Sequence, residues 1–219
     1  MRFFLFNDVK LSFEVQDPVA LIEAYCYQNN FYLNYDVIPV EQRKIKDVNK
    51  IGARIGEGLL EECSKVRREE IDPEHLKIFA YNLDEFLDLD TDEMKVYIDD
   101  FVEKAIKRLL LIGGVRLSKT TKIFHTLYPK IIPMIDNPLQ ELYRKEVNNK
   151  WFGIFVDYYR NFEKDGDTWK NLTAVHETVH ARGLELTKVR IYDILWWSFL
   201  KAKKLKEEQE HVNLTSIKW

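Results

Sequence analysis

The sequence predicts an all-α protein with a small β-hairpin at its N-terminus. Only eight Gly and six Pro occur among 219 residues, and residues that favour helices are common throughout, which argues against a Gly-rich all-β fold. Hydrophobic residues make up 46 % of the chain and include 13 Phe, 11 Tyr and 5 Trp, enough to fill a substantial core. We therefore expect a folded, mainly helical globule rather than a disordered chain.

The first elements expected are two short strands, over residues 3–6 and 10–15, with Asn7-Asp8 between them. Both segments contain Phe and other residues that favour strands, and a polar pair between such segments is typical of a hairpin turn. A helix then starts at Asp17-Pro18, because Asp is a good N-cap and the fixed φ of Pro suits the first helical position. We expect this helix to run to about residue 30.

A second long helix is predicted over residues 46–65. Val48, Ile51, Ile55 and Leu59 recur within it at helical spacing. Three glycines lower its intrinsic helix propensity, and their spacing would allow a close contact with another helix.

Start signals at Asp72-Pro73 and Thr91 predict two more helices, the second running toward Leu111. Another begins at Ser118, and the rest of the chain predicts helices over residues 138–148, 150–164, 168–182 and 187–208. No internal repeat or Pro/Ser-rich linker divides the sequence. We expect one domain over residues 1–219, either undivided or built of two lobes, 1–110 and 111–219.

Cysteine use and hydropathy bear on the compartment. Cys26 and Cys63 have no C-x-x-C spacing, so free thiols in a reducing environment are expected rather than a disulfide or a metal site. The N-terminal apolar run is too short for a signal peptide, and no segment reaches the ~20 apolar residues of a membrane span. We expect a soluble cytoplasmic protein that does not enter a membrane.

The charge of the chain is distributed unevenly, although its net charge is only -3. Residues 104–135 contain no acidic residue, whereas residues 84–103 carry nine carboxylates and one Lys. The acid-free segment carries seven cations, namely Lys104, Lys107, Arg108, Arg116, Lys119, Lys122 and Lys130. It is either a face for an anionic partner or a solvated helix surface, and the lack of mixed charge favours the partner.

A glycine pair lies inside this segment, between an apolar run and the helix that starts at Ser118. A Gly turn before a helix N-terminus offers free N–H groups and a positive dipole end, which suit a phosphate. The candidate nucleic-acid-binding residues are therefore Gly113, Gly114, Arg116, Ser118, Lys119 and Lys122.

His176, Glu177 and His180 form an H-E-x-x-H pattern, which on a helix can bind zinc and supply a general base. The surrounding residues fit a zinc peptidase poorly. Thr178 is small and polar where a large apolar residue is usual, and Leu186 occupies the position of a third ligand. We expect no metal at these residues and no cofactor, and a zinc peptidase is the weakest of the alternatives.

The central segment resembles a known motif. It reads L-I-G-G-V-R-L-S-K-T-T-K-I-F-H from Leu111, and Y-P-K-I-I-P-M-I-D follows from Tyr128. This pattern resembles the helix-hairpin-helix of base-excision DNA glycosylases, in particular the 8-oxoguanine-glycosylase-like branch. In that superfamily a Gly-containing hairpin grips backbone phosphate, and a Pro-x-x-x-Pro segment delivers a catalytic Asp about twenty residues after the hairpin. Pro129 and Pro133 match that segment, and Asp136 follows them.

The resemblance implies a helix-hairpin-helix fold, duplex DNA or RNA as partner, and two catalytic candidates. Asp136 would stabilise positive charge on the sugar or activate a nucleophile, and Lys119 would supply an amine for a Schiff base. Two positions depart from the pattern. Arg116 replaces the second Gly of the hairpin, and Ser118 occupies the ungapped position of the nucleophilic Lys. An enzyme that flips and excises a damaged base and a non-catalytic DNA- or RNA-binding module both remain open.

Overall fold

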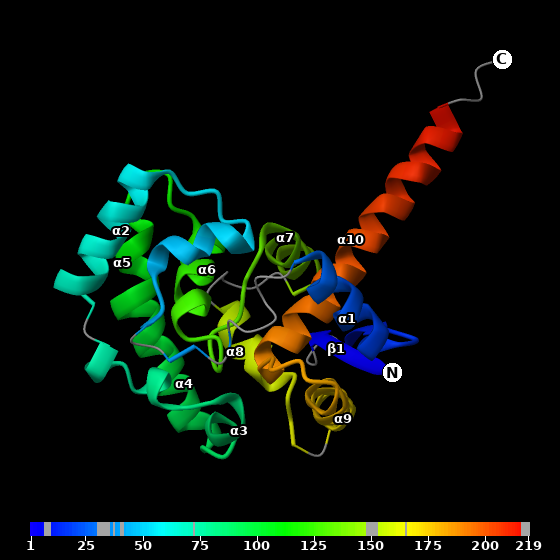
Figure 1. Ribbon diagram of the computed structural model, residues 1–219, viewed down its shortest axis with the longest axis horizontal. Helices are drawn as coiled ribbons and strands as arrows, with labels where there is room; N and C mark the ends of the chain where they lie inside the picture. Colours follow the sequence, from blue (N-terminus) through cyan, green and yellow to red (C-terminus); the bar gives the residue numbers. More distant parts are fainter. Residues whose placement is uncertain are drawn as a thin grey trace.

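The computed structural model of the chain is mainly helical, with one two-stranded antiparallel sheet near the N-terminus (Figure 1). This confirms the all-α class with a hairpin. The structure describes residues 1–6, 10–29, 36, 38–39, 42–71, 73–147, 153–164 and 166–215. Asn7-Asp8, Asp72, most of the stretch 30–41 and the expected start of the helix at residue 150 lie outside the described residues.

The N-terminal elements follow the predicted pattern. Strands β1 (Arg2–Phe6) and β2 (Leu11–Glu14) pair antiparallel, with Phe3 opposite Phe13. Helix α1 spans Pro18–Gln28, and the Asp17 carboxylate accepts a hydrogen bond from the backbone N–H of Ala20 at 2.9 Å. The N-cap therefore starts this helix as its sequence predicts.

The single helix expected over residues 46–65 is wrong. A 3-10 helix, η4, covers Ile45–Ile51 and ends at Gly52, whose φ of 77° is left-handed. Helix α2 begins only at Glu57 and spans Glu57–Glu69, with Gly56 in an extended conformation at its N-cap. The glycines thus break the segment, because they favour the turn that separates two short elements.

The acidic middle of the chain folds into short helices followed by a longer one. The helix expected at residue 72 is reduced to two short 3-10 pieces, η5 (Pro73–His75) and η6 (Lys77–Ala80). Asp90, rather than Thr91, caps the next long helix through a bond from the Glu93 N–H at 2.8 Å. The elements are α3 (Leu83–Phe86), α4 (Thr91–Phe101), the π-helical η7 (Val102–Ile106) and α5 (Lys107–Leu110).

The C-terminal part contains the helices expected from sequence, with ends that shift by a few residues. The last one is longer than predicted. Their bounds are α6 (Leu117–Leu127), α7 (Asn137–Glu146), α8 (Gly153–Arg160), α9 (Asp167–Ala181) and α10 (Lys188–Thr215). No helix in the described part of the chain is long and apolar enough to cross a membrane.

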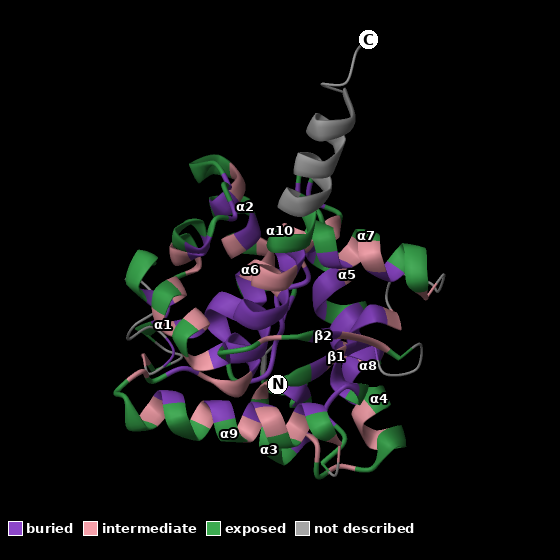
Figure 2. Cartoon of the chain, turned by 90° about the vertical axis from the view of Figure 1, so that its right-hand side faces the viewer, coloured by how far each residue is buried: buried purple, intermediate pink, exposed green. Residues whose placement is uncertain are grey.

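Buried residues from both ends of the sequence form one hydrophobic cluster, concentrated at the centre of the molecule (Figure 2). Phe3 and Phe13 of the sheet stack at 5.5 Å, and Phe13 also contacts Tyr192 of α10. The N–H of Phe4 donates to Thr168 Oγ1 of α9 at 2.8 Å. The N-terminal hairpin is therefore packed against the C-terminal helices.

A buried polar group fixes the segment that leads to Asp136. Asp193 of α10 accepts hydrogen bonds from the Met134 N–H at 2.9 Å, Trp196 Nε1 at 3.0 Å and the Tyr158 hydroxyl at 3.1 Å. The Tyr159 hydroxyl donates to the Ile131 carbonyl at 2.8 Å. Because buried polar groups are stable only when they are hydrogen-bonded, these contacts define the path of residues 131–135.

Candidate nucleic-acid interface

Helices α5 and α6 are joined by a tight glycine turn. Gly114 has a φ of 83°, a left-handed conformation that side chains rarely adopt. Helix α6 starts at Leu117, one residue before the predicted start, and the Arg116 side chain makes no capping bond to it. The first turn of α6 thus has N–H groups that the N-cap residue leaves unsatisfied, as a phosphate-binding helix start requires.

This turn borders a hollow of about 460 Å³, which we call the cationic hollow. Its walls come from the turn and first part of α6, the segment after η4, and the start of α7. It contains the two catalytic candidates, Lys119 and Asp136, and all the predicted binding residues except Gly113. The lining residues are Gly52, Ala53, Arg54, Gly114, Arg116, Ser118, Lys119, Lys122, Asp136, Asn137 and Pro138.

The contacts of Asp136 differ from those that the resemblance suggests. The Ser118 hydroxyl donates to Asp136 Oδ1 at 2.6 Å, and Lys122 Nζ lies 2.9 Å from the same oxygen. The side chains of Lys122 and Asp136 are only 12 % and 14 % exposed. Lys119 Nζ instead donates to the Gly114 carbonyl at 2.9 Å. Lys119 and Asp136 line the same hollow, but the amine in contact with Asp136 is that of Lys122.

Counted over the described residues that line it, the cationic hollow carries a formal charge of +3, from four cations and one carboxylate. The cations are Arg54, Arg116, Lys119 and Lys122. Within the described part of the chain, neither the Arg54 nor the Arg116 guanidinium has an acidic partner. Two unneutralised guanidiniums beside a partly buried ion pair favour a bound anion, and Arg suits the bidentate recognition of phosphate.

Arg54 was not among the residues predicted for the site, although it follows the glycine that breaks the expected helix. Its φ of 53° is left-handed, which is uncommon for a residue other than Gly. The Asn49 side chain fixes this segment through two hydrogen bonds to the backbone of Ile55. It accepts from the Ile55 N–H at 2.7 Å and donates to the Ile55 carbonyl at 2.7 Å. The closed loop from Asn49 to Ile55 places Arg54 against α6.

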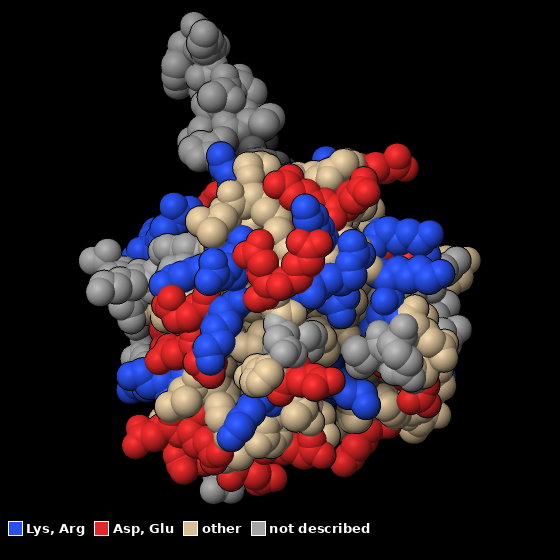
Figure 3. Space-filling model, turned by 90° about the vertical axis from the view of Figure 1, so that its left-hand side faces the viewer, with Lys and Arg blue, Asp and Glu red and all other residues tan. Residues whose placement is uncertain are grey.

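Two other cations of the acid-free segment form ion pairs with carboxylates of the acidic segment that precedes them. Lys104 Nζ lies 2.8 Å from Asp100, and Lys107 forms an ion pair with Glu103. Figure 3 shows acidic side chains gathered along the lower edge of one face, with Lys and Arg above them interspersed with further Asp and Glu. The basic surface is therefore narrower than the seven cations of the acid-free segment suggest.

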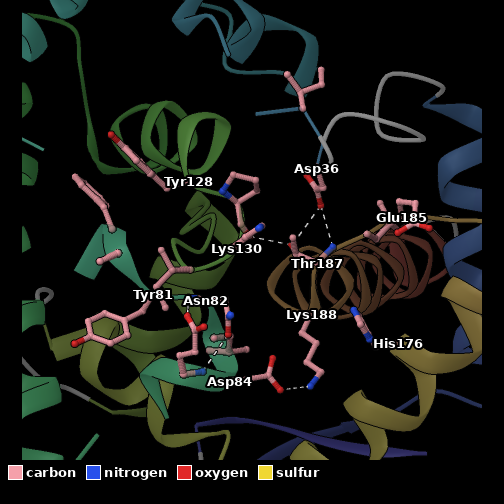
Figure 4. Close-up of a pocket in the computed structure, with 18 of the residues that line it drawn as sticks. Asp36, Tyr81, Asn82, Asp84, Tyr128, Lys130, His176, Glu185, Thr187 and Lys188 are labelled. Carbon is pink, nitrogen blue, oxygen red and sulfur yellow. Dashed lines mark hydrogen bonds and ion pairs between the residues drawn. The ribbon is translucent and has the colours of Figure 1, made fainter. Parts of the chain in front are cut away.

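His176 and His180 line a different and larger hollow, of about 770 Å³ (Figure 4). His180 Nε2 lies 2.8 Å from the Leu186 carbonyl, and its Nδ1 lies 3.4 Å from Glu185. Burial lowers the pKa of His176 to about 4, and electrostatic repulsion from His180 is the second cause. Glu177 is exposed, and among the described residues no three acidic, His or Cys side chains form a group that could hold a metal ion. This geometry does not support a zinc peptidase.

Several charged groups of this larger hollow form ion pairs or hydrogen bonds with other residues that line it. Lys188 forms an ion pair with Asp84, and Asp36 accepts from the Thr187 N–H at 3.1 Å, at the start of α10 (Figure 4). A carboxylate at a helix N-terminus is stabilised by the helix dipole, so Asp36 serves as a cap there. Among its described lining residues, the larger hollow therefore lacks the excess of positive charge that marks the cationic hollow.

No protein-family model, no curated protein and no solved structure matches this chain.

Proposed function

We propose that this protein binds DNA through the cationic hollow, with RNA as the alternative nucleic acid. The proposal depends on one observation, the +3 charge of a hollow that lies beside a left-handed glycine turn and the start of α6. Backbone N–H groups, Arg and Lys are the groups that bind phosphate in nucleic acids. The resemblance of residues 111–136 to the helix-hairpin-helix of DNA glycosylases supports the same partner.

A charge-reversal experiment tests the proposal. Arg54→Glu with Lys119→Glu reverses one exposed and one half-buried cation of the hollow, and we expect the double variant to lose most of the DNA affinity at low salt. If each side chain contacts one phosphate, the slope of log affinity against log salt should fall by about 1.8, because each neutralised phosphate contributes about 0.9. Fluorescence anisotropy with a labelled duplex at several salt concentrations measures both quantities.

Lys95→Glu with Lys104→Glu is the matched control, since it makes the same change in net charge outside the hollow. The control variant should bind as the wild type does. An absence of DNA binding by the wild type at low salt would contradict the proposal. So would equal affinities of the two double variants.

A second candidate function is cleavage of the glycosidic bond of a damaged base, as the resemblance implies. The observation in its favour is that Asp136 lies in the cationic hollow with two amines, those of Lys119 and Lys122. A carboxylate there could stabilise the positive charge that develops on the sugar. However, none of the described residues that line the cationic hollow is aromatic, and a flipped base usually stacks on such side chains. Binding is therefore better supported than cleavage.

Release of a base from oligonucleotides that carry 8-oxoguanine or other lesions tests the second candidate. Borohydride should trap a covalent adduct if an amine attacks the sugar. Comparison of Lys119→Gln with Lys122→Gln then identifies that amine, because trapping is abolished only when the nucleophilic Lys is replaced. If the protein binds DNA but releases no base from a broad panel of lesions, a non-catalytic binding module remains as the better account.

A further inference from the structure

A second hollow, of about 530 Å³, adjoins the cationic hollow. Arg116 and Asn137 line both of them, so the two hollows meet at these side chains. The volume falls within the range of ligand-binding pockets, roughly 300–1,000 Å³. We call this second one the apolar hollow, for the character of its buried lining.

Its lining combines an apolar floor with a polar rim. Four lining residues, Val115, Leu117, Tyr143 and Ile154, are at most 4 % exposed and belong to the hydrophobic core. Half-buried Leu110 completes this apolar side. The remaining lining residues are polar or charged, namely Arg116, Asn137, Gln140, Glu141 and Arg144.

The rim offers both donors and acceptors. Gln140 Nε2 donates to the Ile135 carbonyl at 2.8 Å, which fixes the amide and leaves its oxygen as an acceptor. Arg144 lies one turn further along α7 and contacts the Gln140 carbonyl at 3.4 Å. Exposed Asn137 and Glu141 add an amide and a carboxylate, groups that recognise the edges of bases in protein–nucleic acid complexes.

We propose that the two hollows together bind a single-stranded segment, with a phosphate in the cationic hollow and a neighbouring unpaired base in the apolar hollow. This inference rests on the proposed nucleic-acid binding and specifies the form of the partner. A nucleobase has apolar faces and polar edges, which match an apolar floor inside a polar rim. A base paired within a duplex presents only its edges, and so could not cover the floor. Arg116 lines both hollows, so the proposed phosphate site and the proposed base site are adjacent.

The test compares three labelled probes of equal length by fluorescence anisotropy. They are oligothymidylate, an oligomer of abasic sites with the same backbone, and a fully paired duplex. We expect the wild type to bind oligothymidylate about tenfold more tightly than the abasic oligomer, since a bound base contributes roughly 1–3 kcal/mol. We also expect it to bind oligothymidylate more tightly than the duplex.

A pocket-filling variant locates the base. Leu110→Phe enlarges a half-buried side chain of the apolar hollow, so the preference for oligothymidylate should disappear while the abasic oligomer binds unchanged. Leu111→Phe is the matched control, because Leu111 is 78 % exposed and does not line the hollow. This control should keep the preference.

The outcomes separate this inference from the proposed function. Equal wild-type affinities for thymidylate and abasic oligomers, both lost in Arg54→Glu with Lys119→Glu, would overturn the base site and leave nucleic-acid binding intact. A preference that persists in folded Leu110→Phe would place the base elsewhere and also overturn it. An absence of binding to all three probes at low salt would overturn both proposals. The wild-type comparison decides the question even if Leu110→Phe does not fold.

Discussion

At the scale of single residues, Asp136 is the carboxylate that partly offsets the positive charge of the cationic hollow. Ser118 and Lys122 both contact its Oδ1 atom, and Lys122 lies one turn beyond Ser118 on the same face of α6. A partly buried Lys is costly without a counter-ion, and Asp136 supplies one for Lys122. The same carboxylate repels a phosphate, so a neutral side chain at this position should change the affinity for an anion.

Asp136→Asn is expected to tighten DNA binding several-fold at low salt. The substitution keeps the size of the side chain and an acceptor for Ser118, but it raises the formal charge of the hollow from +3 to +4. Anisotropy titrations measure the change, and any release of a damaged base should be lost at the same time. Asp99→Asn, an exposed carboxylate outside the hollow, should leave the affinity unchanged. An Asp136→Asn variant that binds more weakly would contradict this account of the hollow.

At the scale of elements, the connection between α5 and α6 depends on one backbone conformation. Gly114 is left-handed, whereas Gly113 has no positive φ and nothing lies within 4 Å of a Cβ placed there. A Cβ at Gly114 would meet only Leu59, at an ordinary 3.8 Å. The requirement for Gly at position 114 is therefore conformational rather than steric.

Gly114→Ala should lower the free energy of unfolding by about 1 kcal/mol, because Ala is strained at positive φ. It should also weaken DNA binding, since the turn presents the start of α6 to the partner. Gly113→Ala is the control and should change neither quantity measurably. Urea denaturation and anisotropy provide the two measurements. An unchanged free energy of unfolding for Gly114→Ala would show that the turn tolerates a side chain at position 114 and would contradict this prediction.

The same region shows what the sequence could predict and what it could not. Asp17-Pro18 and the turn before α6 were predictable because their signals are local, a capping side chain and a glycine. The break after η4 was missed because the apolar spacing fits two structures. Ile51, Ala53 and Ile55 are buried and the residues between them exposed, a period of two that helical spacing had masked.

Local patterns select residues of the candidate site but do not specify the contacts between them. Lys119, Ser118 and Asp136, which the glycine turn and the resemblance select, line one hollow, and their functional roles stay predictions. The contact of Asp136 with Lys122 instead depends on how residues 131–135 pack against α6 and α10, which local patterns do not specify. Arg54 joins the site for the same reason, through the loop that Asn49 closes.

At the scale of the whole molecule, α10 holds together segments far apart in the chain. Asp193 fixes the approach to Asp136 through the Met134 N–H, and Tyr192 donates to the Phe4 carbonyl of β1. His125 of α6 lies 3.7 Å from Asp193, and burial lowers the pKa of its imidazole, so it contributes no strong counter-charge at neutral pH. The position of Asp136 in the hollow thus depends on a buried carboxylate in a different helix.

Burial raises the pKa of Asp193 to about 7, against an ordinary value of 3.8, although three hydrogen bonds and Arg190 oppose the shift. Between these two values the folded state holds a proton that the unfolded state has lost. The stabilising contribution of the protonated group is therefore fully present below about pH 4 and is lost as the pH rises through 7. Asp193→Asn removes this titration, so the free energy of unfolding of the wild type, relative to the variant, should fall by roughly 3 kcal/mol from pH 5 to pH 8.

Urea denaturation of both proteins across this range measures the difference between their free energies of unfolding. The contributions of His125 and His176, which have the opposite sign, cancel in this difference. Their lowered pKa values make the protein more stable as the pH rises toward neutrality, and both proteins share that effect. Asp99→Asn is the control and should follow the wild type at every pH, because Asp99 is exposed. A constant difference between wild type and Asp193→Asn would mean that Asp193 is already ionised in the fold at pH 5. The Met134 N–H would then be held by a charged acceptor, and the segment before Asp136 would keep its position independently of pH.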